Sequence, residues 1–426
     1  MKTAELHALF LKCNAVSTDT RNINKNDMFF ALKGDNFNGN KYAESALNKD
    51  AKYAIVDEAK YNNSPNTILV DNVLKTLQEL ASFHRNHLKI PIIALTGSNG
   101  KTTTKELINA VLSKKYNTTA TIGNLNNHIG VPLTLLSMSK DTEIGIVEMG
   151  ANHQKEIEFL CQIAQPDYGY ITNFGKAHLE GFGGIEGVIK GKSEMYNYLI
   201  SNNKLVFVNA NDAIQIDKTM TTKRYIFGNA TEGIDIEVTF LEAQPFVTCK
   251  YDNLEIQSQL IGDYNFNNIA AAIAIGHYFK VNNEDIKNAI EGYIPSNNRS
   301  QIITKNSSKI ILDAYNANPS SMRAALLNFE KQSGKKLAIL GDMFELGNEA
   351  KKEHQNITDL ACSLDLDKII FIGQNFYNSQ TNSDTETQYQ SFDDFKNNFD
   401  FSKIKNQTIL IKGSRGMALE RILELL

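Results

Sequence analysis

The feature that most constrains this chain is a glycine-containing segment, residues 96–104, which reads TGSNGKTTT. It follows the aliphatic run 92–95 and leads into a segment with the apolar repeat of a helix. The apolar positions of that helix are Leu107, Ile108, Val111 and Leu112. Glycine lets the backbone of such a loop turn its N–H groups toward phosphate oxygens, and the helix N-terminus favours an anion. A buried strand that passes through this loop into a helix predicts an α/β fold.

The loop predicts a nucleotide site, with ATP or a close relative as the ligand. Lys101 is placed to contact the β- and γ-phosphates, and the hydroxyl of Thr102 to ligate Mg²⁺. The spacing G-x-x-G-K-T is two residues shorter than the general form. A glycine turn that happens to precede a lysine is the alternative, and the order strand, loop, helix argues against it. The residues expected to bind the nucleotide here are Thr96, Gly97, Ser98, Asn99, Gly100, Lys101, Thr102 and Thr103.

The rest of the sequence indicates α/β layers in three domains. At roughly 150 residues per domain, a chain of 426 residues suggests about three. Candidate joints at 89–91 and 294–300 predict domains at residues 1–88, 89–296 and 297–426. The expected strands are 28–32, 53–56, 67–70, 92–95, 143–149, 310–313, 337–340, 368–372 and 409–412, and the expected helices include 73–87, 185–198 and 267–279. The last domain is expected to be a small parallel unit, with a polar loop at 379–387.

Composition narrows the functional class. The net charge of −4 gives no electrostatic reason to expect nucleic acid or an anionic membrane surface as a partner. The four cysteines are far apart and form no C-x-x-C pair, which is typical of reduced thiols. The first ten residues contain no apolar signal core, and no run approaches the ~20 apolar residues of a membrane span. These observations predict a cytoplasmic enzyme without a membrane span.

Three more positions are candidates, each with a plainer alternative. Glu148 ends a predicted strand, where a carboxylate beside a phosphate loop is placed to hold Mg²⁺; a solvated strand-end glutamate is the alternative. A lone histidine such as His178 is more often a packing or surface residue than a ligand. Lys192 lies on a predicted helix, where lysines usually form a solvated face. Its charge alone assigns it no functional role.

A polar loop follows the strand at 310–313. It contains Asp313 and Asn316. One interpretation is a loop that reaches the nucleotide across a cleft. The other is a simple strand-to-helix connection, capped by Ser320 or Ser321. Residue chemistry alone leaves both open.

Taken together, these motifs resemble the Mur ligase family, which forms amide bonds with ATP in peptidoglycan precursor synthesis. The matching segments are TGSNGKTTTKE at 96–106, VEMGAN at 147–152, AHLEGFG at 177–183, KGKSEMY at 190–196 and GDYNFNN at 262–268. The resemblance implies a small α/β UDP-binding lobe, a central P-loop ATPase α/β domain and a C-terminal Rossmann-like α/β domain. It covers all three segments of the chain.

The resemblance also implies roles for individual residues. Thr102, Glu148, His178 and a carbamylated Lys192 would hold Mg²⁺. Asn268 would lie near the adenine, Arg299 would contact phosphate, and Asp313 and Asn316 would belong to the nucleotide site. The residues expected to act in catalysis are Lys101, Lys192, His178 and Arg299. Tyr264 stands where the family usually has histidine, and no role is assigned to it.

Within the family, the likeness is to the member that adds D-alanyl-D-alanine to UDP-N-acetylmuramoyl tripeptide. It is carried by DAYNANP at 313–319, GDMFELG at 341–347, KGSRGM at 412–417 and GNLNNHIGVP at 123–132. The residues expected to bind that substrate are Thr18, Asp19, Thr20, Arg21, Asn124, Asn126 and Asn127. The alternatives are a diamino-acid-adding member, whose D-N-P-R motif is missing here, a folylpolyglutamate-type ligase, and a nucleotide-switched binding protein. A monomer is expected.

Overall fold

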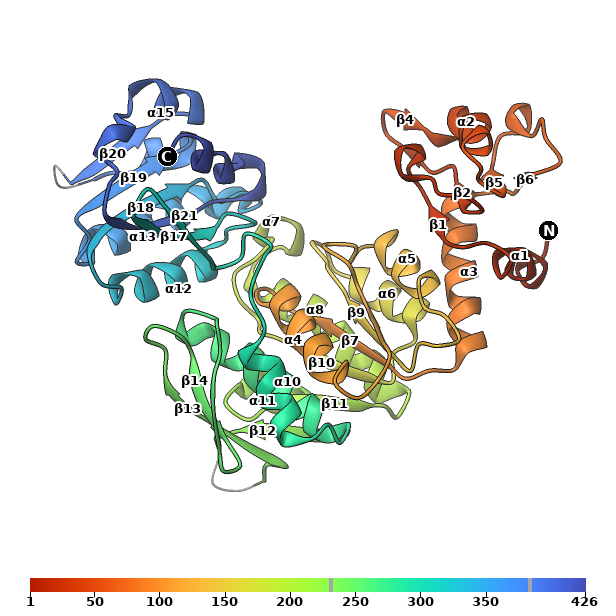
Figure 1. The fold of residues 1–426 in the computed structure, drawn as a ribbon, viewed down its shortest axis with the longest axis horizontal. Coiled ribbons are helices and arrows are strands. Elements are labelled where there is room, and N and C mark those ends of the chain that lie inside the picture. Colours follow the sequence, from red (N-terminus) through yellow and green to blue (C-terminus); the bar gives the residue numbers. More distant parts are fainter. Residues whose placement is uncertain (230–232, 382–384) are drawn as a thin grey trace.

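The computed structural model describes residues 1–229, 233–381 and 385–426. Within these residues lie main sheets of four, nine and six strands, which confirms the α/β fold class (Figure 1). We call residues 1–88 the first lobe, 89–296 the central domain and 297–426 the third domain, and the boundaries stay our proposal. Part of the polar loop predicted at 379–387 lies outside the described residues, since 382–384 are not among them, and the prediction is wrong at 386–387, which belong to a strand.

The first lobe is built on a parallel sheet of order β1-β2-β5-β6. Its strands are β1 (Val16–Ser17), β2 (Met28–Phe30), β5 (Tyr53–Val56) and β6 (Thr67–Leu69), beside the antiparallel pair β3 (Lys33–Gly34) and β4 (Phe37–Asn38). Its helices are α1 (Thr3–Phe10), α2 (Ala43–Asn48) and α3 (Val73–Leu88). The three strands predicted here are confirmed; β1 was not foreseen.

Helix α3 connects the first lobe to the central domain. Asn72 caps its N-terminus by accepting a hydrogen bond from the backbone N–H of Lys75, at 2.8 Å. The helix ends where Lys89 takes a left-handed conformation. Its apolar face is buried in one cluster with strands of both the lobe and the central domain. The joint predicted at 89–91 is therefore a point where the chain enters a shared core.

The central sheet has the order β15-β14-β13-β12-β11-β10-β7-β9-β8 and is parallel from β8 to β13. The strands are β7 (Ile92–Thr96), β8 (Thr118–Ala120), β9 (Ile144–Glu148), β10 (Tyr168–Ile171), β11 (Leu205–Asn209), β12 (Lys223–Gly228), β13 (Ile236–Glu242), β14 (Thr248–Tyr251) and β15 (Leu254–Gln257). The helices are α4 (Lys101–Leu112), α5 (Gly130–Leu136), α6 (Glu156–Ala164), α7 (Leu179–Phe182), α8 (Ile185–Ser201), α9 (Ala213–Lys218), α10 (Phe266–Tyr278) and α11 (Asn283–Glu291). Because β7, β9 and β10 are parallel neighbours, the loops after them meet at one edge of the sheet.

The third domain has a sheet of order β16-β17-β21-β18-β19-β20. Its strands are β16 (Gln301–Lys305), β17 (Ser308–Asp313), β18 (Lys335–Gly341), β19 (Lys368–Ile372), β20 (Glu386–Tyr389) and β21 (Gln407–Lys412). Its helices are α12 (Pro319–Glu330), α13 (Ala350–Ser363), α14 (Gln374–Tyr377) and α15 (Phe392–Asn398). The four strands predicted for this parallel unit are confirmed and pair parallel, whereas β16 was not foreseen and pairs antiparallel with β17 at one edge. Asn306 and Ser307 both have positive φ between these strands, the backbone that a two-residue hairpin turn requires.

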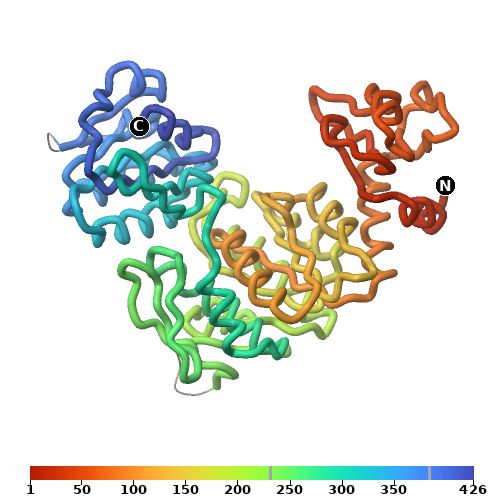
Figure 2. The backbone as a smooth tube through the Cα atoms, viewed as in Figure 1, coloured from red at the N-terminus to blue at the C-terminus, as the bar shows by residue number. Residues whose placement is uncertain are grey.

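Short 3₁₀ helices complete the chain. They are η1 (Thr20–Asn22), η2 (Gly39–Tyr42), η3 (Ala59–Tyr61), η4 (Asp263–Asn265), η5 (Gly347–Glu349), η6 (Phe401–Lys403), η7 (Arg415–Met417) and η8 (Leu419–Glu424). Figure 2 shows the first lobe in red and the third domain in blue at opposite ends, with the central domain between them. Within the described ranges, no helix combines the length and apolar content that crossing a membrane requires.

Candidate active site

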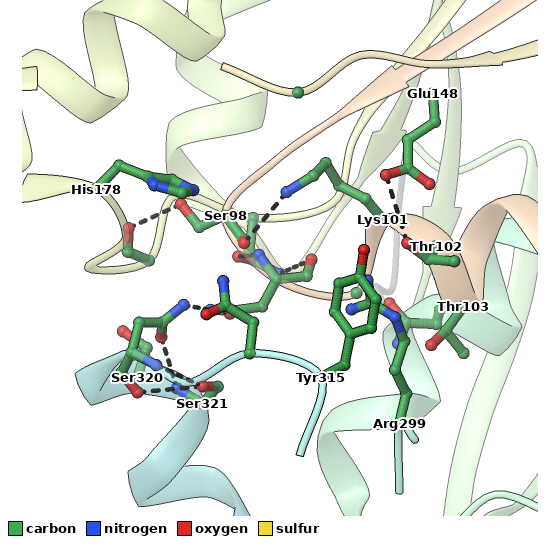
Figure 3. A pocket seen from close by; sticks show the side chains of 18 of the residues that line it. Ser98, Lys101, Thr102, Thr103, Glu148, His178, Arg299, Tyr315, Ser320 and Ser321 are labelled. Atoms are coloured by element: carbon green, nitrogen blue, oxygen red, sulfur yellow. Dashed lines mark hydrogen bonds between the residues drawn. The ribbon is translucent and has the colours of Figure 1, made fainter. Parts of the chain in front are cut away.

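A cavity of about 770 Å³ lies where the central and third domains meet. Figure 3 shows side chains of the phosphate loop on one side and the third-domain loop with Tyr315 and Ser320 on the other. The predicted site residues that line the cavity are Ser98, Asn99, Gly100, Lys101, Thr102, Thr103, Asn124, Asn126, Asn127, Glu148, His178, Asn268, Arg299, Asp313 and Asn316. Residues predicted from separate motifs thus share one cavity.

The phosphate loop depends on its two glycines. Gly97 and Gly100 have φ of +143° and +78°. A Cβ on Gly97 would come within 2.0 Å of the Thr172 hydroxyl, and one on Gly100 within 2.5 Å of Asn268. A side chain at either position would therefore displace the loop. Neighbouring contacts hold it in place, including one in which Ser98 Oγ donates to the carbonyl of Gly175 at 2.7 Å.

Lys101 opens α4 and lines the cavity. Its Nζ donates to the carbonyl of Gly97 at 2.8 Å, so the ammonium is folded back over the loop. Burial lowers the pKa of Lys101 to about 8, and Glu148 partly offsets this by favouring the charged form. Among the described residues no carboxylate forms an ion pair with Lys101, so its ammonium can take an anion.

Glu148, at the end of β9, is almost fully buried with 1% of its surface exposed. Its Oε1 accepts from Asn126 Nδ2 at 2.7 Å and from Thr102 Oγ1 at 3.4 Å. Its Oε2 is buried and has no hydrogen-bond partner among the described residues. A buried carboxylate oxygen without a partner is costly, and a divalent cation beside Thr102 would satisfy it. The residues present therefore fit a magnesium ion.

Lys192 is completely buried on α8 and is not among the residues that line the cavity. Its Nζ donates to the carbonyl of Ala151 at 3.0 Å and lies 5.0 Å from the centre of the Phe182 ring. Burial lowers the pKa of Lys192 well below its ordinary value, and the charge of Lys101 adds to this. The expectation that such a lysine would form a solvated face is wrong; the side chain favours the neutral amine.

His178 precedes α7 in a left-handed backbone conformation. Its Nδ1 contacts the carboxylate of Glu345 in the third domain, and this contact lowers the pKa of Glu345. His178 thus bridges two domains at the cavity wall. Among residues 1–229, 233–381 and 385–426, no three His, Cys, Asp or Glu side chains are grouped to hold a metal. Of the four residues expected to hold a metal, Thr102, Glu148 and His178 line the cavity and Lys192 does not.

The third-domain loop lines the same cavity as the phosphate loop. Arg299 stacks on the Tyr315 ring, with 3.8 Å between the guanidinium carbon and the ring centre. Asp313 Oδ2 accepts from Lys412 Nζ at 2.5 Å, and the carbonyl of Asn316 accepts from the same amine at 3.3 Å. The loop lines the cavity, as the first interpretation expected; it also connects β17 to α12, whose N-cap is Asn318 and not Ser320 or Ser321.

Asn268 and Tyr264 connect α10 to the loops. Asn268 Oδ1 accepts from the Thr104 hydroxyl at 3.0 Å, and its Nδ2 donates to Asn265 at 2.8 Å. Tyr264 Oη is 2.8 Å from Ser300 Oγ, and burial is the main cause that raises the pKa of this phenol. Tyr264, which had no predicted role, therefore ties the start of α10 to the segment that carries Arg299.

The residues predicted to bind substrate fall into two groups. Asn124, Asn126 and Asn127 line the cavity, and Asn127 Oδ1 also accepts from the backbone N–H of Gly130 at 2.9 Å, at the start of α5. The others, Thr18, Asp19, Thr20 and Arg21, lie in the first lobe and do not line it. Asp19 and Arg21 pair with each other at 2.7 Å on the surface of the lobe.

Sequence reasoning missed the contacts that join the two domains. Asn318 Nδ2 donates to Asn99 Oδ1 at 2.7 Å, and Lys176 Nζ donates to Glu353 at 2.6 Å. Lys412 was missed as well, although it ends the strand predicted at 409–412. Its place at the carboxyl end of β21, parallel to β17, was the available signal, because it puts Lys412 beside Asp313.

Comparison with known proteins agrees with this site. Family models match in order: Mur ligase family, catalytic domain (residues 12–91), Mur ligase middle domain (95–276) and Mur ligase, glutamate ligase domain (298–415). The UDP-N-acetylmuramoyl-tripeptide–D-alanyl-D-alanine ligase of Bacillus subtilis (strain 168) is 34% identical over 96% of this chain and 92% of its own length.

Two solved structures show the same architecture. The crystal structure of MurF from Acinetobacter baumannii has a TM-score of 0.88 and 30% identity, and the match covers 100% of this chain and 98% of that one. MurF ligase from Thermotoga maritima, in complex with ADP, has a TM-score of 0.82 and 25% identity over 98% of this chain and 97% of that one. Because family models and full-length relatives agree, the chain belongs to the Mur ligase family.

Proposed function

We propose that this chain is the ATP-dependent ligase that adds D-alanyl-D-alanine to UDP-N-acetylmuramoyl tripeptide. The observation that carries the proposal is the cavity at which the phosphate loop faces the third-domain loop of Asp313 and Tyr315. Full-length relatives carry that activity in their names, and one relative was solved with ADP. ATP is therefore the nucleotide, and the product is a peptide bond of a peptidoglycan precursor.

The reaction follows from the chemistry of a carboxylate. A carboxylate oxygen of the tripeptide attacks the γ-phosphorus of ATP, and ADP leaves, which gives an acyl phosphate. The amine of D-alanyl-D-alanine then attacks the acyl carbon and loses a proton. Phosphate departs with the oxygen that had belonged to the carboxylate. Two anions must meet in the first step, so charge neutralisation and positioning are the main demands on the protein.

Lys101 and Arg299 supply positive charge from the protein itself, one from each side of the cavity. Lys101 would lie against the β- and γ-phosphates, and Arg299 would contact phosphate from the third domain. A bound Mg²⁺, held by Thr102 and Glu148, would supply further charge stabilisation. The unpartnered Oε2 of Glu148 supports that assignment. Asn268 would lie at the adenine, with Asp313 and Asn316 completing the nucleotide site.

Lys192 would act as its carbamate. A neutral amine adds to carbon dioxide with loss of a proton, and burial lowers the pKa of Lys192, which favours that neutral form. The product carries a carboxylate-like group and so gives the metal site a second anionic ligand beside Glu148. We expect Lys192→Ala to lose most activity, with partial recovery in added short carboxylates. An unimpaired Lys192→Ala enzyme would remove Lys192 from the mechanism.

The two groups of substrate residues suggest that the substrate spans two domains. We propose that Thr18, Asp19, Thr20 and Arg21 bind the UDP end on the first lobe. Asn124, Asn126 and Asn127 would contact the muramoyl peptide where it enters the cavity. A monomeric state and a cytoplasmic location stay predictions.

A phosphate-release panel tests the function. It pairs UDP-muramoyl dipeptide and UDP-muramoyl tripeptides with D-alanyl-D-alanine, D-alanine, L-lysine and diaminopimelate. We expect release only with a tripeptide and D-alanyl-D-alanine together. Turnover of the dipeptide with L-lysine or diaminopimelate would identify a diamino-acid-adding ligase instead. Release that depends on none of the acceptors would point to a nucleotide-driven switch.

A further inference from the structure

Arg299 and Tyr315 are brought together by the β16–β17 hairpin. The antiparallel register pairs Gln301 with Leu312, so the residues just before β16 and just after β17 lie opposite each other. The backbone N–H of Tyr315 donates to the carbonyl of Asn298 at 3.2 Å, which extends this pairing beyond the strands. The stack of Arg299 on Tyr315 is therefore fixed by the backbone of the hairpin.

Arg299 has no carboxylate partner among the residues that the structure describes. Its Nε is buried, and no atom of the described part of the chain forms a hydrogen bond with it. The nearby carboxylate of Asp313 is already bound to Lys412 at 2.5 Å. The charge of Arg299 nevertheless reaches the phosphate loop, because it helps to lower the pKa of Lys101. Arg299 is thus a cation held at the cavity with its N–H groups uncommitted.

An aromatic ring can hold a guanidinium in place without binding its N–H groups. A carboxylate would bind the N–H edge of Arg299 and neutralise it, whereas a ring binds the flat face. The in-plane N–H groups then remain available to the oxygens of a phosphate. Figure 3 shows the Tyr315 ring against Arg299, with its hydroxyl pointing toward the part of the site that holds Lys101 and Thr102.

We propose that Tyr315 is a positioning residue that holds the Arg299 guanidinium ready for the nucleotide phosphates. The proposal rests on the proposed function, since it assumes that the cavity binds ATP. Tyr315 acts through the face of its ring, so the aromatic ring matters and the hydroxyl does not. Arg415 lies 5.7 Å from the same ring but is exposed and paired with Glu420 at 2.9 Å, so it does not replace Arg299.

The test compares two substitutions at Tyr315 with a matched control elsewhere in the domain. Tyr315→Phe keeps the ring and Tyr315→Leu removes it. Phe392→Leu removes a comparable stack, in which Arg421 lies 3.5 Å from the ring centre, away from the cavity. We expect Tyr315→Leu to weaken ATP binding, measured by calorimetry, about tenfold. Tyr315→Phe and Phe392→Leu should stay within about twofold of the parent. Equal ATP affinity for the Phe and Leu variants at 315 would overturn the proposal.

A double-mutant cycle with Arg299→Ala identifies the partner. If Tyr315 acts through Arg299, Tyr315→Leu adds nothing to the loss that Arg299→Ala causes. Additive losses would overturn the positioning role while leaving the nucleotide site intact. If Arg299→Ala does not change ATP affinity at all, the site assignment behind the proposed function fails as well.

A spectroscopic variant gives a readout that does not depend on turnover. The chain contains no tryptophan, so Tyr315→Trp introduces the sole indole as a reporter. We expect its emission to change when Arg299→Ala is added and when ATP binds. Tryptophan emission that changes neither with Arg299→Ala nor with ATP would contradict the stacking of residue 315 on Arg299.

Discussion

The central domain meets its two neighbours through different kinds of surface. Toward the first lobe, Leu77 and Leu80 of α3 are fully buried in a cluster shared with Val131 and Leu135 of α5. Toward the third domain, much of the contact is polar and surrounds the cavity, as in the Lys176–Glu353 pair. A smaller apolar cluster accompanies it, in which Leu179 and neighbours pack on the third domain.

This difference between the two joints indicates that the first-lobe joint stays closed, while the third-domain joint can open and close. Apolar burial is non-directional, and separating α3 from α5 would expose that surface to water at a large cost. Hydrogen bonds and ion pairs can be exchanged for contacts with water or ligand at small net cost. We therefore expect the first-lobe joint to determine stability and the third-domain joint to respond to substrates. Figure 2 shows how the chain places one joint on each side of the central domain.

The largest expected effect is on activity at the polar joint. Lys101→Ala removes a cation that faces the phosphates, and we expect turnover to fall about 10³-fold. The melting temperature should change little, because burial already disfavours the charge of Lys101 and lowers its pKa to about 8. Steady-state kinetics and a thermal melt on the same sample check both statements. A variant with normal turnover would remove Lys101 from the site.

The next effect is on stability at the apolar joint. Leu80→Ala creates a cavity at a fully buried position, and we expect unfolding to become easier by about 3 kcal/mol. Urea denaturation measures this, with Leu69→Ala as the control because Leu69 is 42% exposed. The turnover of the folded variant should stay within tenfold of the parent. A kinetic loss as large as that of Lys101→Ala would break the contrast between the two joints.

A smaller effect is expected from the pair between Lys176 and Glu353. The Glu353 side chain is buried, so Lys176→Met leaves a carboxylate without its partner. We expect kcat/KM to fall about fivefold and Lys176→Met/Glu353→Gln to recover part of the loss. An exposed pair, Lys75–Glu79 on α3, serves as the control. Kinetics of Lys176→Met equal to those of the parent would show that the pair does not contribute to domain contact.

The smallest effect concerns pH at the apolar joint. His7 Nε2 and His84 Nδ1 are 3.0 Å apart, and His84 Nε2 donates to the carbonyl of Met138 at 2.8 Å. Burial, with the nearby His84 and His87, lowers the pKa of His7 to about 4. Above pH 6.5 the His7 ring is neutral in both the folded and the unfolded protein. As the pH falls from 6.5 toward 4, the unfolded chain binds the proton first, so the folded state loses stability.

His7→Leu should flatten that dependence. The measurement is the urea midpoint at pH 7.5 and pH 5 for both proteins, compared as a difference within each protein. An equal loss of stability in parent and variant would show that His7 does not titrate with unfolding.

Much of the fold could be predicted because its signals are local. The strand, loop and helix at 92–112 follow from aliphatic runs, glycines and an apolar helical face, and the structure confirms them. Strand β20 was missed because its residues are polar and only half-buried, so no apolar run marks it. The β16–β17 hairpin had a signal in Asn306 and Ser307 that strand patterns alone did not reveal.

The site was less accessible to sequence reasoning, because its contacts cross domains. Neither the Asn99–Asn318 hydrogen bond nor the stack of Arg299 on Tyr315 follows from spacing along the chain. Burial of Lys192 had a local signal in Gly191, where a Cβ would come within 2.4 Å of the Phe182 ring.

The central claim is that the γ-phosphate of ATP activates the carboxylate of the tripeptide. Isotope transfer tests it most directly, with UDP-muramoyl tripeptide carrying ¹⁸O in the reacting carboxylate, ATP and D-alanyl-D-alanine. The claim predicts that each phosphate released carries one ¹⁸O atom, because the carboxylate oxygen leaves with the phosphate. Phosphate that contains oxygen from water and none from the tripeptide would contradict it.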